Sequence, residues 1–229
     1  MLFDLRGRGR RRTVQVIYIT LALLMGGGLV LFGIGGNTSG GLVDAINGGG
    51  SGTSADKVFQ KRLKTYEQRA KANPNDAANW SNLARLHFQQ AGTGENFNAT
   101  QGAYTEKGLA ELRDASAAWK RHLAVAGDKP DPNAASLMAQ AYGQAGLKQY
   151  PDAVKALEVF IDARKATPQL YGQLAILAAA AKQDRKSQLS EDKAVSLTPK
   201  KDRKNFKAQI DLAKQQLTAT PTTTPSTSG

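Results

Sequence analysis

The segment AKANPNDAANWSNLA, residues 70–84, decides the fold of this chain of 229 residues. An apolar stripe ends at Ala70, the stretch Asn-Pro-Asn-Asp follows, and a second stripe begins at Trp80. Because Pro with Asn and Asp marks a turn between periodic segments, this pattern predicts two helices joined by a tight turn. The surrounding residues 56–217 are rich in Ala, Leu, Gln and Lys and poor in β-branched runs, which extends the all-α prediction over that whole range.

The spacing within this segment resembles the junction between two tetratricopeptide repeats (TPR). Pro74, Trp80, Leu83 and Ala84 match the Pro, aromatic, large apolar and small positions of that family. The resemblance implies a helical-hairpin solenoid of about three repeats, in which small residues let neighbouring helices approach closely. A middle repeat resembles the pattern in two halves, which about five extra residues around Leu147 to Asp152 separate; they are Met138, Ala139 and Tyr142, then Ala156, Phe160, Ala163 and Pro168. A last repeat matches at Tyr171, Leu174, Ala175, Ser187, Ala194 and Pro199.

The first repeat departs most from the family pattern. A polar insertion from Gly92 to Tyr104 delays its second helix, which is anchored by Ala115 and Trp119. Amphipathic helices flank the repeats, and we expect them to cap the solenoid and keep its ends soluble. Their apolar stripes are Phe59, Leu63, Tyr66 and Ala70 before the repeats, and Phe206, Ile210, Ala213 and Leu217 after them.

Residues 1–34 predict a membrane anchor of the bacterial signal-anchor type. Five arginines within residues 1–12 precede residues 14–34, a run of 21 residues without a charged side chain. A helix of that length is about 31 Å long, which matches the roughly 30 Å hydrocarbon core. The positive-inside rule then places residues 1–13 in the cytoplasm and everything after Gly35 outside. The alternatives are a buried hairpin helix and a cleaved signal peptide; the latter has the small-x-small triplet Gly33-Ile34-Gly35 but an apolar stretch longer than the usual about 7–15 residues.

Two low-complexity segments border the predicted solenoid. Residues 35–55 contain Gly, Asn, Ser and Thr in the composition of a flexible tether. Residues 218–229 are Thr, Pro and Ser without an apolar period, which predicts a disordered tail. Within the predicted span, Ala22 and Gly26 form a small-xxx-small pair, so we also expect weak homodimerisation through the anchor.

The net charge of +12 divides into parts with different meanings. Residues 1–12 carry +4, residues 13–181 carry +3, and residues 182–214 carry +5. The first part orients the anchor, and we interpret the last as the solvated face of a capping helix rather than a nucleic-acid site. An extracytoplasmic domain does not meet the genome, so no nucleic-acid partner is expected.

The residue inventory argues against an enzyme. The chain has no Cys and two His, and it contains none of the phosphate-loop, zinc-protease or serine-hydrolase motifs. The acidic residues are scattered along the sequence, whereas a hydrolase would need two carboxylates facing one cleft. We therefore expect no catalytic residues, no cofactor and no metal, with His87 and His122 in structural or solvated roles.

The family resemblance also implies where a partner would bind. In TPR proteins the groove is lined by first-helix residues beside the aromatic position, and the aromatic residues themselves are interior. The implied core aromatics are Trp80, Trp119, Tyr142, Phe160 and Tyr171. The implied groove residues are Ser81, Asn82, Arg85 and Gln89 in the first repeat, Ser136, Gln140 and Gln144 in the second, and Gly172 and Ile176 in the third.

These expectations combine into a membrane-anchored, non-catalytic adaptor. Its groove of amides, hydroxyls and one Arg would hydrogen-bond a protein or peptide partner in the cell envelope. The rival hypothesis is a cytoplasm-facing regulatory module whose basic C-terminal helix contacts an acidic partner or nucleic acid.

Overall fold

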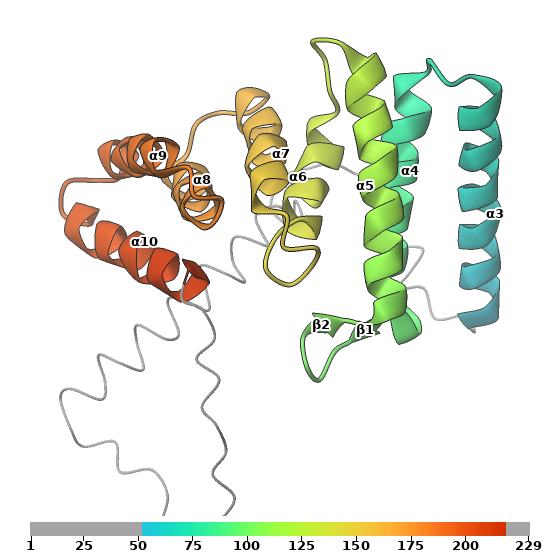
Figure 1. Ribbon diagram of the computed structural model, residues 1–229, viewed down its shortest axis with the longest axis horizontal. Helices are drawn as coiled ribbons and strands as arrows, with labels where there is room; N and C mark the ends of the chain where they lie inside the picture. Colours follow the sequence, from blue (N-terminus) through green and yellow to red (C-terminus); the bar gives the residue numbers. More distant parts are fainter. Residues whose placement is uncertain (1–51, 219–229) are drawn as a thin grey trace, which may run out of the picture. The chain divides into compact units, whose positions relative to one another are not determined.

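The computed structural model describes residues 52–218, and this part of the chain is mostly helical (Figure 1). The part described holds eight α-helices, one short 3₁₀-helix and one two-stranded hairpin. The α-helices are Gly52–Ala72 (α3), Ala77–Ala91 (α4), Glu106–Ala126 (α5), Pro132–Ala141 (α6), Tyr150–Asp162 (α7), Pro168–Ala180 (α8), Asp184–Leu197 (α9) and Arg203–Thr218 (α10). The smaller elements are Gly94–Asn96 (η1), Phe97–Asn98 (β1) and Ala103–Tyr104 (β2).

The helices pack in sequential pairs. α4 packs on α5, α6 on α7 and α8 on α9, while α3 covers α4 and α10 rests on α8 and α9. This confirms the all-α prediction and the pairing of helices along the chain. The described residues form two compact units, one with α3 to α7 over residues 52–165 and one with α8 to α10 over residues 166–218.

Local capping explains why several helices begin where they do. The Asp76 carboxylate accepts a hydrogen bond from the Ala78 N–H at the start of α4, and Asp131 does the same for Asn133 at the start of α6. The Thr167 hydroxyl accepts from the Leu170 N–H at the start of α8. α6 and α8 also carry Pro in their first turn, where the missing N–H has no helical partner to lose.

Small residues bring α4 and α5 together in the first unit. Ala84, Ala91 and Ala115 are buried at this contact region, along with Leu112. Gly108 sits where α5 approaches the end of α4, because a Cβ atom there would lie 2.1 Å from the Asn96 carbonyl oxygen. The packing therefore depends on small side chains, as the repeat pattern predicted for Ala84 and Ala115.

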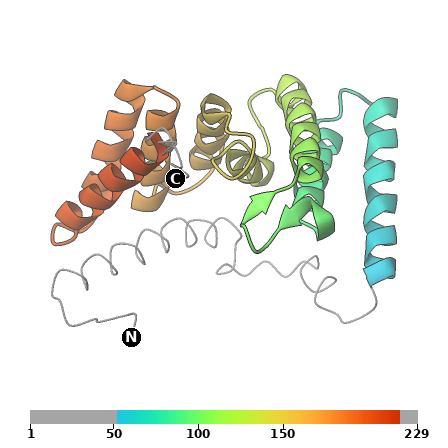
Figure 2. The ribbon, with the colours of Figure 1, turned by 60° about the horizontal axis from the view of Figure 1, so that its bottom comes forward.

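The predicted polar insertion, Gly92 to Tyr104, is partly ordered as a hairpin. β1 pairs antiparallel with β2, with Phe97 opposite Tyr104. The two rings meet edge to face with centroids 5.2 Å apart. In Figure 2 the hairpin lies at the end of α5, at the base from which that helix begins. The insertion was predicted from the sequence, but no strand was predicted within it.

The second unit has a small core of its own. Ala175, Ile176 and Ala194 from α8 and α9 are buried with Ile210 and Ala213 of α10, and Tyr171, Phe206 and Leu217 pack against them. All four residues in the predicted stripe of the last helix thus face this core, Ile210 and Ala213 as buried and Phe206 and Leu217 as partly buried side chains. The capping interpretation of α10 agrees with this arrangement.

Several predictions fall outside the described residues. The predicted membrane span 14–34, most of the linker 35–55, the tail after Thr218 and the pair Ala22 and Gly26 all lie there. Among the helices between residues 52 and 218, none is long and apolar enough to span a membrane.

Candidate binding surface

The α4 part of the predicted groove is only partly accessible. Ser81 is buried, and its hydroxyl donates to the Ala78 carbonyl at 3.2 Å within the same helix. Asn82 is half-buried and donates through Nδ2 to the same carbonyl at 2.8 Å. Ser81 therefore belongs to the helix packing and is no groove residue, while the carbonyl oxygen of the Asn82 amide stays available.

The α6 part of the predicted groove is likewise accessible at some residues and buried at others. Ser136 is buried and donates to the Asn133 carbonyl at 2.9 Å. Gln140 is half-buried, with its Nε2 only 3.5 Å from the Ser136 carbonyl, and Gln144 is exposed just beyond the end of α6. The prediction that the Ser81 and Ser136 hydroxyls line the groove is thus wrong, because both side chains are buried and both hydroxyls donate to carbonyl oxygens of their own helices.

Four of the other predicted groove residues lie on α4 and α6, two helices in direct contact. α4 packs against α6 within the first unit, so Asn82, Arg85 and Gln89 on one helix neighbour the helix that carries Gln140. Arg85 is half-buried, and its guanidinium makes no hydrogen bond or ion pair with any other residue between 57 and 218. We call Asn82, Arg85, Gln89 and Gln140 the first-helix surface.

The two groove positions predicted on α8, Gly172 and Ile176, are covered by other side chains. Ile176 is 8 % exposed and packs with Ile210 and Ala213 of α10. A Cβ atom at Gly172 would lie 3.3 Å from the Phe206 ring and 3.5 Å from Ile210. The prediction that Gly172 and Ile176 line an open groove is therefore wrong, because the C-terminal helix occupies that face of α8.

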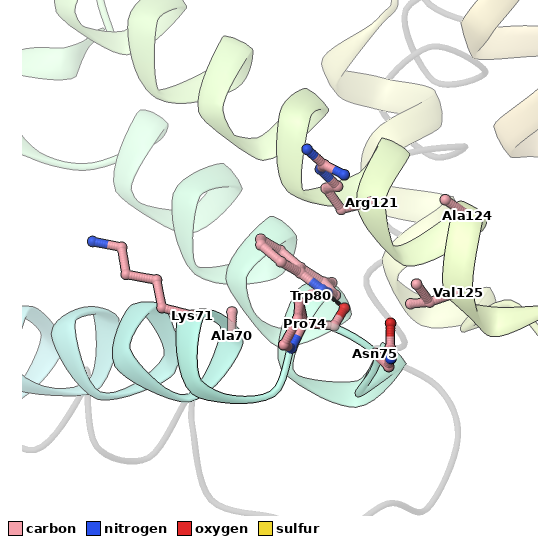
Figure 3. Close-up of a pocket in the computed structure, with 8 residues that line it drawn as sticks. All are labelled: Ala70, Lys71, Pro74, Asn75, Trp80, Arg121, Ala124 and Val125. Atoms are coloured by element: carbon pink, nitrogen blue, oxygen red, sulfur yellow. Dashed lines mark hydrogen bonds between the residues drawn. The ribbon is translucent and has the colours of Figure 1, made fainter.

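A separate hollow of about 320 Å³ lies where α3, its following turn, α4 and α5 meet. Figure 3 shows Trp80 in its floor with Pro74 beside it and Arg121 and Val125 on the α5 side. The Trp80 indole donates to the Pro74 carbonyl at 2.8 Å, which fixes the ring. None of the first-helix surface lines this hollow.

The predicted core aromatics are not all interior. Trp119, Tyr142 and Phe160 are buried, and the Tyr142 hydroxyl shares a 2.8 Å hydrogen bond with Ser116. Burial raises the pKa of Tyr142. Trp80 and Tyr171 are half-buried, because the first lines the hollow and the second sits at the edge of the α10 contact.

His122 is a structural side chain in the first unit, as predicted. It is 3 % exposed and stacks on Trp119 with ring centroids 5.1 Å apart. Its Nε2 accepts a hydrogen bond from the Asp131 N–H at 2.8 Å, and its Nδ1 lies 2.9 Å from the Ala77 carbonyl oxygen. Because Nε2 is an acceptor, Nδ1 carries the proton and donates to Ala77.

His87 has acidic neighbours that the sequence analysis did not connect with it. Its Nδ1 lies 2.8 Å from Glu111 Oε2, and one ligand atom each of His87, Glu111 and Asp114 lie within 4.8 Å of one another. The expectation that acidic residues are scattered is wrong at this point, because α4 and α5 bring the three side chains together. The spacing of Glu111 and Asp114, one turn apart on one helix, is the signal that could have suggested it.

The second unit contains a buried carboxylate between two lysines. Glu191 on α9 is 2 % exposed and accepts hydrogen bonds from Lys207 and, at 2.5 Å, from Lys214, both on α10. Burial raises the pKa of Glu191, but the two ammonium groups outweigh burial and hold it below its ordinary value. The same contact with Glu191 raises the pKa of Lys207. Two lysines of the basic helix are therefore paired internally, contrary to a purely solvated face.

Comparisons with known proteins give no relative for this chain. No protein-family model, no curated protein and no solved structure matches it.

Proposed function

We propose that this protein is a membrane-anchored, non-catalytic adaptor of the TPR type, which binds a protein or peptide partner at the extracytoplasmic face of the cell membrane. The observation that carries the proposal is Arg85, a half-buried guanidinium without a partner among the described residues. Helices packed in sequential pairs and the repeat-like spacing at Pro74, Trp80 and Leu83 support the TPR assignment.

The chemistry of the first-helix surface indicates the kind of partner. A guanidinium offers five N–H donors in a fixed fork that matches a carboxylate or two carbonyl oxygens. Partial burial removes some of its water, so an acceptor supplied by a partner would restore hydrogen bonds that the fold does not provide. Amides at Asn82, Gln89 and Gln140 offer both donors and acceptors, as a peptide backbone requires.

The proposed location of the protein in the cell rests on its first 34 residues. The five arginines before an uncharged run of 21 residues support an anchor with the helical units outside. Protease added to intact spheroplasts should then degrade residues 52–218. Protection of these residues until the cells are lysed would overturn the extracytoplasmic location and favour the rival regulatory module.

The rival module depends on free positive charge near the C-terminus. Lys207 and Lys214 are engaged with Glu191, which leaves Lys200, Lys201 and Lys204 as exposed lysines around the start of α10. This internal pairing reduces the charge available to an acidic partner and so favours the adaptor over the module.

The binding surface is tested by photocrosslinking in living cells. A photoreactive amino acid is placed singly at Arg85 or Gln140, with Ala117, an exposed position on α5, as the matched control. We expect adducts of the same mass from the first two positions and little from Ala117. Equal trapping from all three positions would contradict a partner bound at the first-helix surface.

A further inference from the structure

The cluster of His87, Glu111 and Asp114 combines three metal-ligating side chains from two helices. His87 lies on α4, and the two carboxylates lie one turn apart on α5. One ligand atom from each lies within 4.8 Å of the other two. Because α4 and α5 form a closely packed pair, the backbones that carry the ligands are held in place relative to each other.

We propose that these three side chains bind a divalent transition-metal cation, for which Zn²⁺ is the probe. An imidazole nitrogen with two carboxylates is a donor set that Zn²⁺ accepts, whereas Ca²⁺ and Mg²⁺ prefer oxygen ligands alone. Three protein ligands leave a position for water. The metal would join α4 to α5.

The negative charge of the two carboxylates supports the binding of a cation at this cluster. Glu111 and Asp114 lie close together, and neither has a Lys or Arg partner within the part of the chain that the structure describes. The repulsion between two carboxylates at this range is relieved when a cation binds between them. His87 is the one side chain there that already contacts a carboxylate.

The geometry needs only a small adjustment to admit the ion. His87 Nδ1 and Glu111 Oε2 are 2.8 Å apart, while two ligands at about 2.0–2.1 Å from a tetrahedral Zn²⁺ are about 3.3 Å apart. Side-chain rotation of roughly half an ångström provides this difference. Asp114 is exposed, so the ion can enter from solvent and the third ligand can swing onto it.

The test measures Zn²⁺ binding to the tag-free full chain in detergent by calorimetry. The variant Asp114→Asn removes one ligand at an exposed position, and Asp128→Asn removes an equivalent exposed charge elsewhere as the control. We expect one Zn²⁺ per chain, unchanged affinity in Asp128→Asn, and at least about tenfold weaker binding in Asp114→Asn. Zn²⁺ should also raise the midpoint of thermal unfolding of the wild type more than that of Asp114→Asn.

A second variant, Glu111→Gln, and circular dichroism of each protein separate loss of the metal from loss of the fold. Co²⁺ in place of Zn²⁺ should give visible absorption bands that depend on His87. Absence of Zn²⁺ binding by the folded wild type would overturn the proposal. Equal affinity in the wild type, Asp114→Asn and Glu111→Gln would overturn it too, because the ion would then bind elsewhere.

Discussion

His122, near the C-terminal end of α5, connects that helix to the starts of two others. Its ring joins the Ala77 carbonyl at the first residue of α4 to the Asp131 N–H at the cap of α6, and it stacks on Trp119 of its own helix. The position of His122 one turn after Trp119 is visible in the sequence, but its two partners are not, because they are 45 and 9 residues away.

Replacing His122 with Phe tests this role. Phe retains the stacked ring but removes the hydrogen bonds to the Ala77 carbonyl and from the Asp131 N–H, so we expect a loss of about 1–3 kcal/mol in the free energy of unfolding. Urea unfolding followed by circular dichroism measures it. The neighbouring exposed substitution Arg121→Met should stay within about 0.5 kcal/mol of the wild type, and an equally small effect of His122→Phe would show that the two hydrogen bonds contribute little.

The lowered pKa of Glu191 predicts how the stability of the fold depends on pH. Its pKa in the folded chain is held below 4.5 by Lys207 and Lys214, so its charged form stabilises the fold fully above about pH 4.5. That contribution is lost as the pH falls through the lowered pKa. Thermal unfolding between pH 7 and pH 3 should show a steeper acid loss in the wild type than in Glu191→Gln.

The comparison with Glu191→Gln isolates the contribution of the Glu191 carboxylate to the stability of the fold. Asp211, which lies 3.4 Å from Lys207, is present in both proteins, so the two chains differ only at residue 191. At pH 7 the variant should be less stable, by about 1–3 kcal/mol, because two ammonium groups lose their shared acceptor. Parallel pH profiles of the two proteins would mean that the Glu191 contact does not stabilise the α9 and α10 pair.

At the scale of elements, the approach of α5 to the end of α4 depends on Gly108. A Cβ atom there would lie 2.1 Å from the Asn96 carbonyl oxygen and 3.1 Å from that of Ala91. Gly108→Ala should therefore destabilise the chain by about 1–3 kcal/mol, although Ala favours helix more than Gly does. The matched control is Gly92→Ala, since its added Cβ would meet its nearest atom at an ordinary 3.6 Å. Equal stabilities of the two variants in urea would contradict the proposed close contact.

The existence and type of the helices could be predicted from sequence because their signals are local. The stripes at Phe59 to Ala70 and Phe206 to Leu217 correspond to α3 and α10, and the Asn-Pro-Asn-Asp turn lies between α3 and α4. The β1–β2 hairpin was missed, because two paired residues per strand leave no alternating pattern to detect. Its order depends on the contact of Phe97 with Tyr104, which a local pattern does not reveal.

The candidate site could be predicted less well than the helices. Pattern matching placed Arg85 and Gln140 on neighbouring first helices, and the contact of α4 with α6 agrees with that. It failed for Ser81 and Ser136, whose short hydroxyls bond to their own helices, and for Ile176, which α10 covers. It also missed the cluster at His87, because Glu111 lies 24 residues away beyond an insertion of irregular length.

At the scale of the whole molecule, the charge of +12 has more than one structural role. Part of the basic C-terminal region is bound internally through Glu191, while Arg85 in the nearly balanced central region has no partner in the described chain. The cation available at the first-helix surface is therefore the single Arg85, and we assign partner binding to this residue rather than to the lysine-rich helix.

The central claim, that Arg85 and its neighbours bind a partner, is tested most directly by photocrosslinking from Gln140 in cells, with either Arg85 or Arg85→Glu in the same chain. Loss of a charge-assisted hydrogen bond of about 1.5–3 kcal/mol corresponds to a tenfold or greater loss of affinity. We predict one dominant adduct with Arg85 and at least about tenfold less of it with Arg85→Glu, at equal protein levels. The same adduct yield from both chains would contradict it.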